Sequence, residues 1–402
     1  MTPILGFLLL VTIAFVGKVL ISPRIRKNHP FLLALSASGI PYILIGVMLG
    51  PRGFDVLNEE ILAELHPLIS LGLGWVGFLF GIQLQWRNIR RFPANYLLFT
   101  SLQSLIALII IGGVIVLVLI ALEIPTMQAV EYAVIFAIIG SMTAPMALAR
   151  MIISHKLRGK LVHLIQFSSS LDAFWGIVFI GGFFIMKQSL LPSGITIPWL
   201  WLVIVLVLGM SLGFSFIYLL RLRFEPQELL LLILGLIIFV SGIGFYLHLS
   251  PIFLTMVVGV VIAQFSLPAR RLSRVLLFAE KPVYLMMLIF AGAWWNVPAT
   301  TQVWIIIVFL IARLAGKICG GWLASRTVSM GFPVPGNIGI PLLAFGGTAL
   351  AVAFNYLLFN VNPMGDLVIS ATIIGIVVFD ELAMWGTRRV LPSEDYQAED
   401  TR

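Results

Sequence analysis

The stretch Gly140-Ser141-Met142-Thr143-Ala144-Pro145 interrupts an otherwise apolar segment at residues 130–152. A proline removes one backbone hydrogen bond of a helix, and glycine lowers helix stability. A second apolar segment, 334–359, begins with the similar run Pro335-Gly336-Asn337-Ile338-Gly339-Ile340-Pro341. Unwound backbone inside an apolar segment is tolerated only where it lines a cavity or is buried in protein. We therefore predict two discontinuous helices. The residues predicted at the interruptions are Ala144, Pro145, Gly336, Asn337 and Gly339.

The composition of the chain is that of a membrane protein. Of its 402 residues 60% are hydrophobic and only 10% are charged, with a mean hydropathy of +1.09. A soluble protein could not bury so much apolar surface, which excludes a soluble enzyme. The net charge of +8 comes from basic residues in small groups between apolar segments, a pattern of membrane topology rather than of nucleic-acid binding. The fold class is therefore all-α and polytopic.

Thirteen apolar segments are long enough to cross a bilayer, at about 20 residues each. They are 3–21, 31–50, 67–84, 95–122, 130–152, 161–186, 197–220, 227–247, 250–266, 282–297, 302–325, 334–359 and 366–386. Alternate connections differ in charge, because one set holds nineteen Lys and Arg and the other holds two. This asymmetry predicts an external N-terminus and a cytoplasmic C-terminus. The first segment is expected to be a retained helix and not a signal peptide.

An internal repeat is suggested by helices two and nine. Pro41 to Pro51 is similar to the run from Ser250 to Gly259, and these helices lie seven apart in the order of the chain. An odd separation makes them cross in opposite directions, as inverted repeats do. The same register pairs helix five with helix twelve, the two interrupted helices. A matched pair of interruptions indicates a transport site, although an ordinary proline kink is the alternative for either helix alone.

Asp172 is the carboxylate that falls in the middle of an apolar segment, helix six. An ionisable group at that depth marks an ion or proton pathway by default. Lys317 falls at similar depth in helix eleven, and Arg313 lies one helical turn before it on the same face. We interpret Lys317 as functional and Arg313 as a partner of carbonyls freed by the helix breaks. Asp380 and Glu381 lie near Arg388 and Arg389 and are interpreted as interfacial. No cofactor is expected, because the five histidines lack ligand spacing, Cys319 has no cysteine partner and no phosphate loop is present.

Several of these stretches together resemble the monovalent cation/proton antiporter superfamily, the sodium/proton exchangers and their relatives. They are Pro41 to Pro51, Leu71 to Leu84, Thr143-Ala144-Pro145, Leu171-Asp172, Gly316-Lys317 and Gly336 to Gly339. The resemblance runs in order from helix two to helix thirteen. It implies a homodimer with inverted-topology repeats, in which helices five and twelve cross beside the acidic residue of helix six.

The resemblance also implies a division into a dimer-facing panel and a mobile core. Panel helices one to three would lie within 1–94 and panel helices eight to ten within 226–300. Core helices four to six would lie within 95–190 and core helices eleven to thirteen within 301–386. Helix seven, within 191–225, would be a linker, and 387–402 a short cytoplasmic tail.

The site residues follow from the same resemblance. Asp172 would bind both the cation and the proton, Thr143 would supply oxygen near it, and Lys317 would match the lysine of helix eleven. Ser169, within the run Ser168 to Ser170, is a further candidate oxygen ligand. No metal other than the transported monovalent cation is expected. Three positions depart from the family pattern, because relatives often have acids where this chain has Leu171, Gln83 and Asn337.

Exclusive binding of a proton or a small cation to one carboxylate is the physical basis of exchange. With Asp172 alone, one proton would exchange for one Na⁺ or K⁺, which predicts electroneutral antiport in a cell membrane, inner or plasma. Lys317 as a second proton carrier would make the exchange electrogenic instead. The missing acids support another hypothesis, a transport-inactive homologue serving as a sensor or a subunit of a membrane assembly. A passive channel is a third hypothesis.

Overall fold

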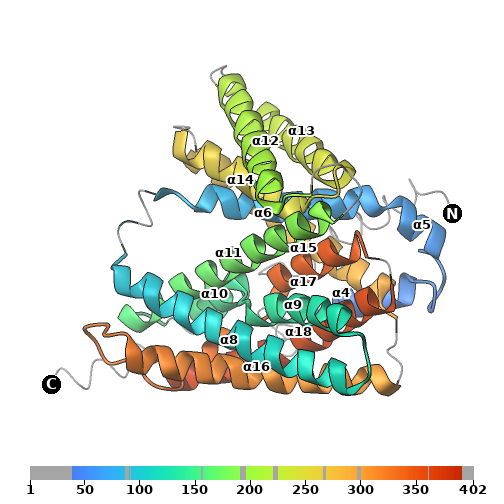
Figure 1. Ribbon diagram of the computed structural model, residues 1–402. Helices are drawn as coiled ribbons and strands as arrows, with labels where there is room; N and C mark the ends of the chain where they lie inside the picture. The colour runs from blue at the N-terminus through green and yellow to red at the C-terminus, as the bar shows by residue number, and fades with distance from the viewer. Residues whose placement is uncertain are drawn as a thin grey trace, which may run out of the picture. The chain divides into compact units, whose positions relative to one another are not determined.

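The computed structural model describes residues 39–86, 90, 92–154, 157–190, 196–220, 225–265, 269–296, 300–360 and 362–391, and these ranges contain helices and no strands (Figure 1). The helices are α4 (Ile40–Leu49), α5 (Glu59–Glu64), α6 (His66–Gln83), α8 (Ala94–Ala121), α9 (Thr126–Ser141), α10 (Pro145–Ser154), α11 (Lys160–Ser189), α12 (Pro198–Leu219), α13 (Pro226–Tyr246), α14 (Pro251–Phe265), α15 (Ala269–Trp294), α16 (Thr300–Thr327), the 3₁₀ turn η1 (Pro341–Leu343), α17 (Gly346–Leu357) and α18 (Pro363–Val390).

The predicted all-α membrane fold is confirmed. Within the described ranges, eight helices are long and apolar enough to cross a membrane, and shorter apolar helices accompany them. Every predicted segment from 67–84 onward coincides with one helix or with a broken pair. The segment 3–21 and the beginning of 31–50 lie outside the described residues. The largest boundary difference is in α15, which begins at Ala269 and not near 282.

Proline marks the start of many of these helices. Pro198, Pro226 and Pro363 are at the first positions of α12, α13 and α18. The missing N–H of proline costs nothing there, because the first amides of a helix have no intrahelical acceptor. The same preference explains why α10 begins at Pro145 after an interruption.

The helices group into two compact units. The first unit contains α4 to α6, α12 to α15, residues 177–189 of α11 and residues 354–360. The second contains α8 to α10, residues 160–176 of α11, α16, η1, residues 346–353 of α17 and α18. Helix seven, predicted as a linker, is α12 and falls in the first unit. The panel, core and linker roles stay predictions.

Close backbone contacts at glycine organise the first unit. A Cβ added to Gly77 of α6 would overlap the carbonyl of Ile252 in α14, and a Cβ on Gly259 of α14 would press on α6. Helices α4 and α15 approach each other in the same way at Gly46 and Gly292. Small residues allow membrane helices to pack this closely. The two pairs are helices three with nine and two with ten, which an inverted repeat offset by seven helices would interchange.

The second unit positions the candidate site. Helix α8 packs along α16 and α9, and α18 packs against η1. Large side chains that are fully buried among them include Phe99, Phe136, Phe309 and Phe379. Polar and charged side chains are buried in the same unit, at the interruptions of the helices.

Candidate functional site

The two interruptions meet backbone to backbone. Helix α9 ends at Ser141 and α10 begins at Pro145, with the backbone of Met142 extended between them. The amide of Ala144 donates to the carbonyl of Ala344 at 2.9 Å. Backbone groups that left the two helices therefore pair with each other, which satisfies hydrogen bonds that no lipid could provide.

The second interruption lies further along the chain than the sequence indicated. Gly336, Asn337 and Gly339 form turns before η1, and the break itself is at Ala344 and Phe345, between η1 and α17. Pro341 begins the short 3₁₀ turn, and Gly346 starts α17 with φ of 47°, a conformation that favours glycine.

The three predicted residues of this run have different surroundings. Gly336 and Asn337 are exposed. Gly339 is buried against α16, where an added Cβ would overlap the carbonyl of Lys317. Only Gly339 therefore adjoins the residues described next.

Asp172 belongs to the second unit and has no exposed surface. Lys317 Nζ is 2.7 Å from Asp172 Oδ2, and neither side chain is exposed. Thr143 Oγ1 donates to Asp172 Oδ2 at 2.7 Å, and Gln103 Nε2 lies 2.8 Å from both carboxylate oxygens. The carboxylate is therefore surrounded by side chains from α8, α16 and the break after α9.

Thr143 connects the ion pair to the crossing point of the helices. Its hydroxyl lies 2.9 Å from Lys317 Nζ, 2.9 Å from the carbonyl of Leu342 and 2.7 Å from Asp172 Oδ2. A hydroxyl has one hydrogen to donate and lone pairs to accept with. It accepts from the ammonium and donates to either the carboxylate or the carbonyl, so its hydrogen can follow the state of Asp172.

Gln103 was missed in the sequence interpretation. It lies inside the very apolar helix α8 and has no exposed surface. The signal in the sequence was the spacing of Thr100, Gln103 and Ser104, which places three polar side chains on one helical face. In the structure all three are buried. Thr100 Oγ1 is 2.8 Å from Ser168 Oγ on α11, so this polar face lies against the helix that carries Asp172.

Arg313 contacts both broken helices, as the sequence suggested. Its guanidinium donates to the carbonyls of Gly140 and Met142, and to that of Leu343 at 3.0 Å. It also lies 3.9 Å from the ring centre of Phe345. The C-terminal end of a helix carries partial negative charge and unpaired carbonyls, so a cation there stabilises the interrupted backbone.

The interfacial interpretation of Asp380 was wrong. Its side chain is 7% exposed, and its Oδ1 accepts from the amide of Phe345 at 2.9 Å. Helix α18 continues to Val390, so Asp380 lies about three turns before its end, and closeness to Arg388 in sequence was misleading. A carboxylate at the start of α17 complements the positive end of that helix.

Ser169 is buried, but its hydroxyl donates to the carbonyl of Gln166 at 2.9 Å. The structure does not bring it into hydrogen-bond contact with Asp172. At the three positions without an acid, Leu171 is partly buried, whereas Gln83 and Asn337 are exposed. Among the described residues, no cluster of three His, Cys, Asp or Glu could hold a metal ion.

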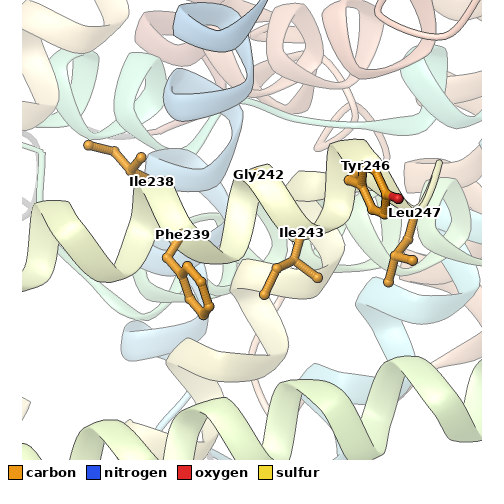
Figure 2. A pocket seen from close by; sticks show the side chains of 6 residues that line it. All are labelled: Ile238, Phe239, Gly242, Ile243, Tyr246 and Leu247. Carbon is orange, nitrogen blue, oxygen red and sulfur yellow. The ribbon is translucent and has the colours of Figure 1, made fainter.

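A separate hollow of about 450 Å³ lies on α13 in the first unit. Figure 2 shows its lining side chains, which are apolar apart from the hydroxyl of Tyr246. They are Ile238, Phe239, Gly242, Ile243, Tyr246 and Leu247. Such a lining has no charged oxygen to offer an ion.

Two solved structures of one antiporter are similar to this chain. A structure of the sodium proton antiporter MjNhaP1 from Methanocaldococcus jannaschii at pH 8 has a TM-score of 0.68 at 14% identity, covering 97% of this chain and 99% of that one. An electron-microscopy map of the same antiporter has a TM-score of 0.64 at 15% identity and covers 96% of each chain. At such identities the likeness establishes the fold. Among curated proteins, no sequence matches.

A match to a family model identifies the family of this chain, which the structural likeness does not. The model described as sodium/hydrogen exchanger, transmembrane, matches residues 9–382, which is nearly the whole chain. The members of this family are secondary transporters, not enzymes. The match includes both broken helices and the helices that carry Asp172 and Lys317. The chain therefore belongs to the sodium/hydrogen exchanger family.

Proposed function

We propose that this protein exchanges protons for a monovalent cation, Na⁺ or K⁺, with Asp172 as the shared binding site. The observation that supports this most strongly is the burial of Asp172 beside Lys317 and Thr143, next to the point where two interrupted helices meet. A carboxylate can bind a proton or a small cation, but not both at once. Binding one therefore requires release of the other, and net exchange follows when the site opens alternately to the two sides.

The ion pair supports exchange without net charge movement. With Lys317 charged and paired to Asp172, the site carries one positive charge whether a proton or a monovalent cation occupies the carboxylate. Both loaded forms then cross the membrane with equal charge. Release of a proton from Lys317 would instead make exchange electrogenic, and membrane voltage would shift the balance point of transport.

Alternating access is proposed to occur between a panel and a core in each protomer of a homodimer. The division of the described helices into two compact units is compatible with this arrangement, and Asp172, Lys317 and Thr143 all belong to one unit. The protein would lie in a cell membrane with its N-terminus outside and its C-terminus in the cytoplasm. That orientation rests on the nineteen-to-two distribution of basic residues.

Exchange can be measured with a pH-sensitive dye in inside-out vesicles. The parent protein should collapse an imposed proton gradient on addition of Na⁺ or K⁺. Asp172→Asn should abolish the response, because a neutral amide cannot take up and release a proton in exchange for the cation. Electroneutral exchange also predicts no effect of an imposed membrane potential on the balance point. Ser169→Ala should respond like the parent, because Ser169 bonds within its own helix.

The proposal would be contradicted if the parent protein showed no response to Na⁺, Li⁺ or K⁺ between about pH 6 and pH 9, a range on both sides of neutrality. The hypothesis of a transport-inactive sensor or subunit would then take its place. A response that survives Asp172→Asn would retain exchange but move its site elsewhere.

A further inference from the structure

Gln103 on α8 is a buried polar side chain at the site to which the proposed function assigns no role. Its Nε2 is 2.8 Å from Asp172 Oδ1 and 2.8 Å from Oδ2. Its Oε1 is buried and lacks a hydrogen-bond partner in the part of the chain that the structure describes. An unsatisfied acceptor at full burial is unfavourable and calls for an explanation.

The primary amide offers two arrangements of nearly the same shape. Rotation of the terminal torsion of glutamine exchanges the positions of its oxygen and its nitrogen, and this torsion has broad energy minima. In the observed arrangement the NH₂ group donates to the carboxylate, which suits an empty and charged Asp172. After rotation, Oε1 would face both oxygens of Asp172, and the amide would present an acceptor to whatever occupies them.

The two oxygens of Asp172 have different neighbours. Oδ2 is contacted by Lys317 Nζ and by Thr143 Oγ1 as well as by Gln103. Oδ1 is contacted by Gln103. A cation that enters on the Oδ1 side would therefore meet the amide first and could leave the ion pair with Lys317 in place. Both loaded forms carry the same charge as long as Lys317 keeps its proton.

We propose that Gln103 is a cation ligand of the exchanger, and that its amide turns with the occupancy of Asp172. The NH₂ group donates to the empty carboxylate. Oε1 coordinates the bound cation, or accepts the hydrogen of the protonated carboxyl group. This inference rests on the proposed function, since it assigns the residue that completes the oxygen set of the same site.

The test compares Gln103→Leu and Gln103→Glu in proteoliposomes that contain the full chain. Gln103→Leu removes the oxygen, and we expect it to weaken the apparent affinity for Na⁺ about tenfold, the effect of losing one polar contact to a charged group. Gln103→Glu keeps an oxygen and removes the NH₂ group, so its Na⁺ affinity should remain at or above that of the parent. Its ratio of Na⁺ to K⁺ affinity should change, because a carboxylate is a stronger ligand than an amide.

The measurement that separates a ligand from a mere hydrogen-bond donor is the limiting affinity at high pH. Competition by protons disappears there. A residue that only donates to the empty carboxylate stabilises the unloaded site, so its removal would raise the limiting Na⁺ affinity, whereas removal of a ligand lowers it. A Na⁺ affinity of Gln103→Leu equal to or above that of the parent under these conditions would overturn the proposal. If Gln103→Leu does not fold, an unchanged Na⁺ to K⁺ ratio in Gln103→Glu would overturn it equally.

The matched control is Ser104→Ala, the neighbouring buried polar residue of the same helix. It should leave the Na⁺ affinity unchanged, because its hydroxyl forms no hydrogen bond with Asp172 or with any other described residue. Failure of the parent itself to exchange would refute the proposed function. If the parent exchanges ions but Gln103→Leu binds Na⁺ at high pH as tightly as the parent does, only the role of Gln103 is refuted.

Discussion

Asp172 and Lys317 form an ion pair with Nζ 2.7 Å from Oδ2 and with neither side chain exposed. Removing two charges from water costs several kcal/mol for each ion, and their attraction offsets this only with good geometry and further hydrogen bonds. Thr143 and Gln103 supply those hydrogen bonds. The pair is therefore stable only while these hydrogen bonds and its geometry are kept.

Breaking this pair from one side should destabilise the protein. Lys317→Met leaves the carboxylate buried without its partner, a change that typically costs about 3–5 kcal/mol. The thermal midpoint of the purified protein in detergent should fall clearly, and the double variant Asp172→Asn/Lys317→Met should recover much of the loss. Lys160→Met, at an exposed lysine, is the control and should melt like the parent. Equal midpoints for Lys317→Met and the control would mean that the pair contributes little to stability.

At the scale of elements, the broken helices are held by side chains from neighbouring helices. Arg313 on α16 donates to carbonyls of both breaks, and Asp380 on α18 accepts from the amide of Phe345, just before α17. One cation at the carbonyl ends and one anion at an amide end complement the dipoles of the half-helices. The interruptions are therefore built into the packing of the second unit and are not local kinks alone.

The glycine contacts of the first unit lead to a prediction on helix packing. Gly77→Ala places a methyl group where α6 meets the backbone of α14, so the helices must move apart, at a cost of about 1–3 kcal/mol for overpacking. The variant should show a lower thermal midpoint than the parent. Gly242→Ala on α13 is the matched control, because an added Cβ there meets nothing within 4 Å. A Gly77→Ala protein as stable as the control would show that the contact is adaptable.

At the scale of the whole molecule, two features connect the units along the chain. Helix α11 carries Asp172 in the second unit and continues into the first after Gly176. Helix α17 is divided in the same way, between Ala353 and Phe354. Helix α11 is predicted helix six, which the inverted repeat would pair with helix thirteen. Helix α17 is part of predicted helix twelve, which it would pair with helix five.

The orientation in the membrane can be tested by labelling. After replacement of the exposed Cys319 by Ser, single cysteines at Met127 and at Ser329 would report on opposite sides, since both positions are exposed. The distribution of basic residues places Met127 outside and Ser329 in the cytoplasm. A membrane-impermeant maleimide added to intact cells should label Met127→Cys and not Ser329→Cys. Labelling in the reverse pattern would invert the orientation.

Most of the helices could be predicted because apolar length and charge alternation are local properties of the sequence. The fold class, the interruption at Pro145, the burial of Asp172 and the role of Arg313 all follow from such signals. Gln103 could not be recognised in the same way, because one polar residue in a long apolar helix has many harmless explanations. Asp380 was misjudged because distance in sequence from Arg388 says nothing about packing against α17.

The sequence by itself determined that this is a polytopic membrane protein with two interrupted helices and a carboxylate within an apolar segment. The physical reason is that a segment inside a bilayer must be apolar and must satisfy its own backbone hydrogen bonds, so exceptions stand out in the sequence. Only the tertiary structure decided which groups meet that carboxylate. Lys317, Thr143 and Gln103 are far from Asp172 along the chain, and their 2.7 to 2.8 Å contacts with it depend on how three helices pack. The same packing moved the second break from Gly336 to Ala344 and Phe345, where η1 and α17 are joined. Contacts between distant segments have no signature in either segment alone.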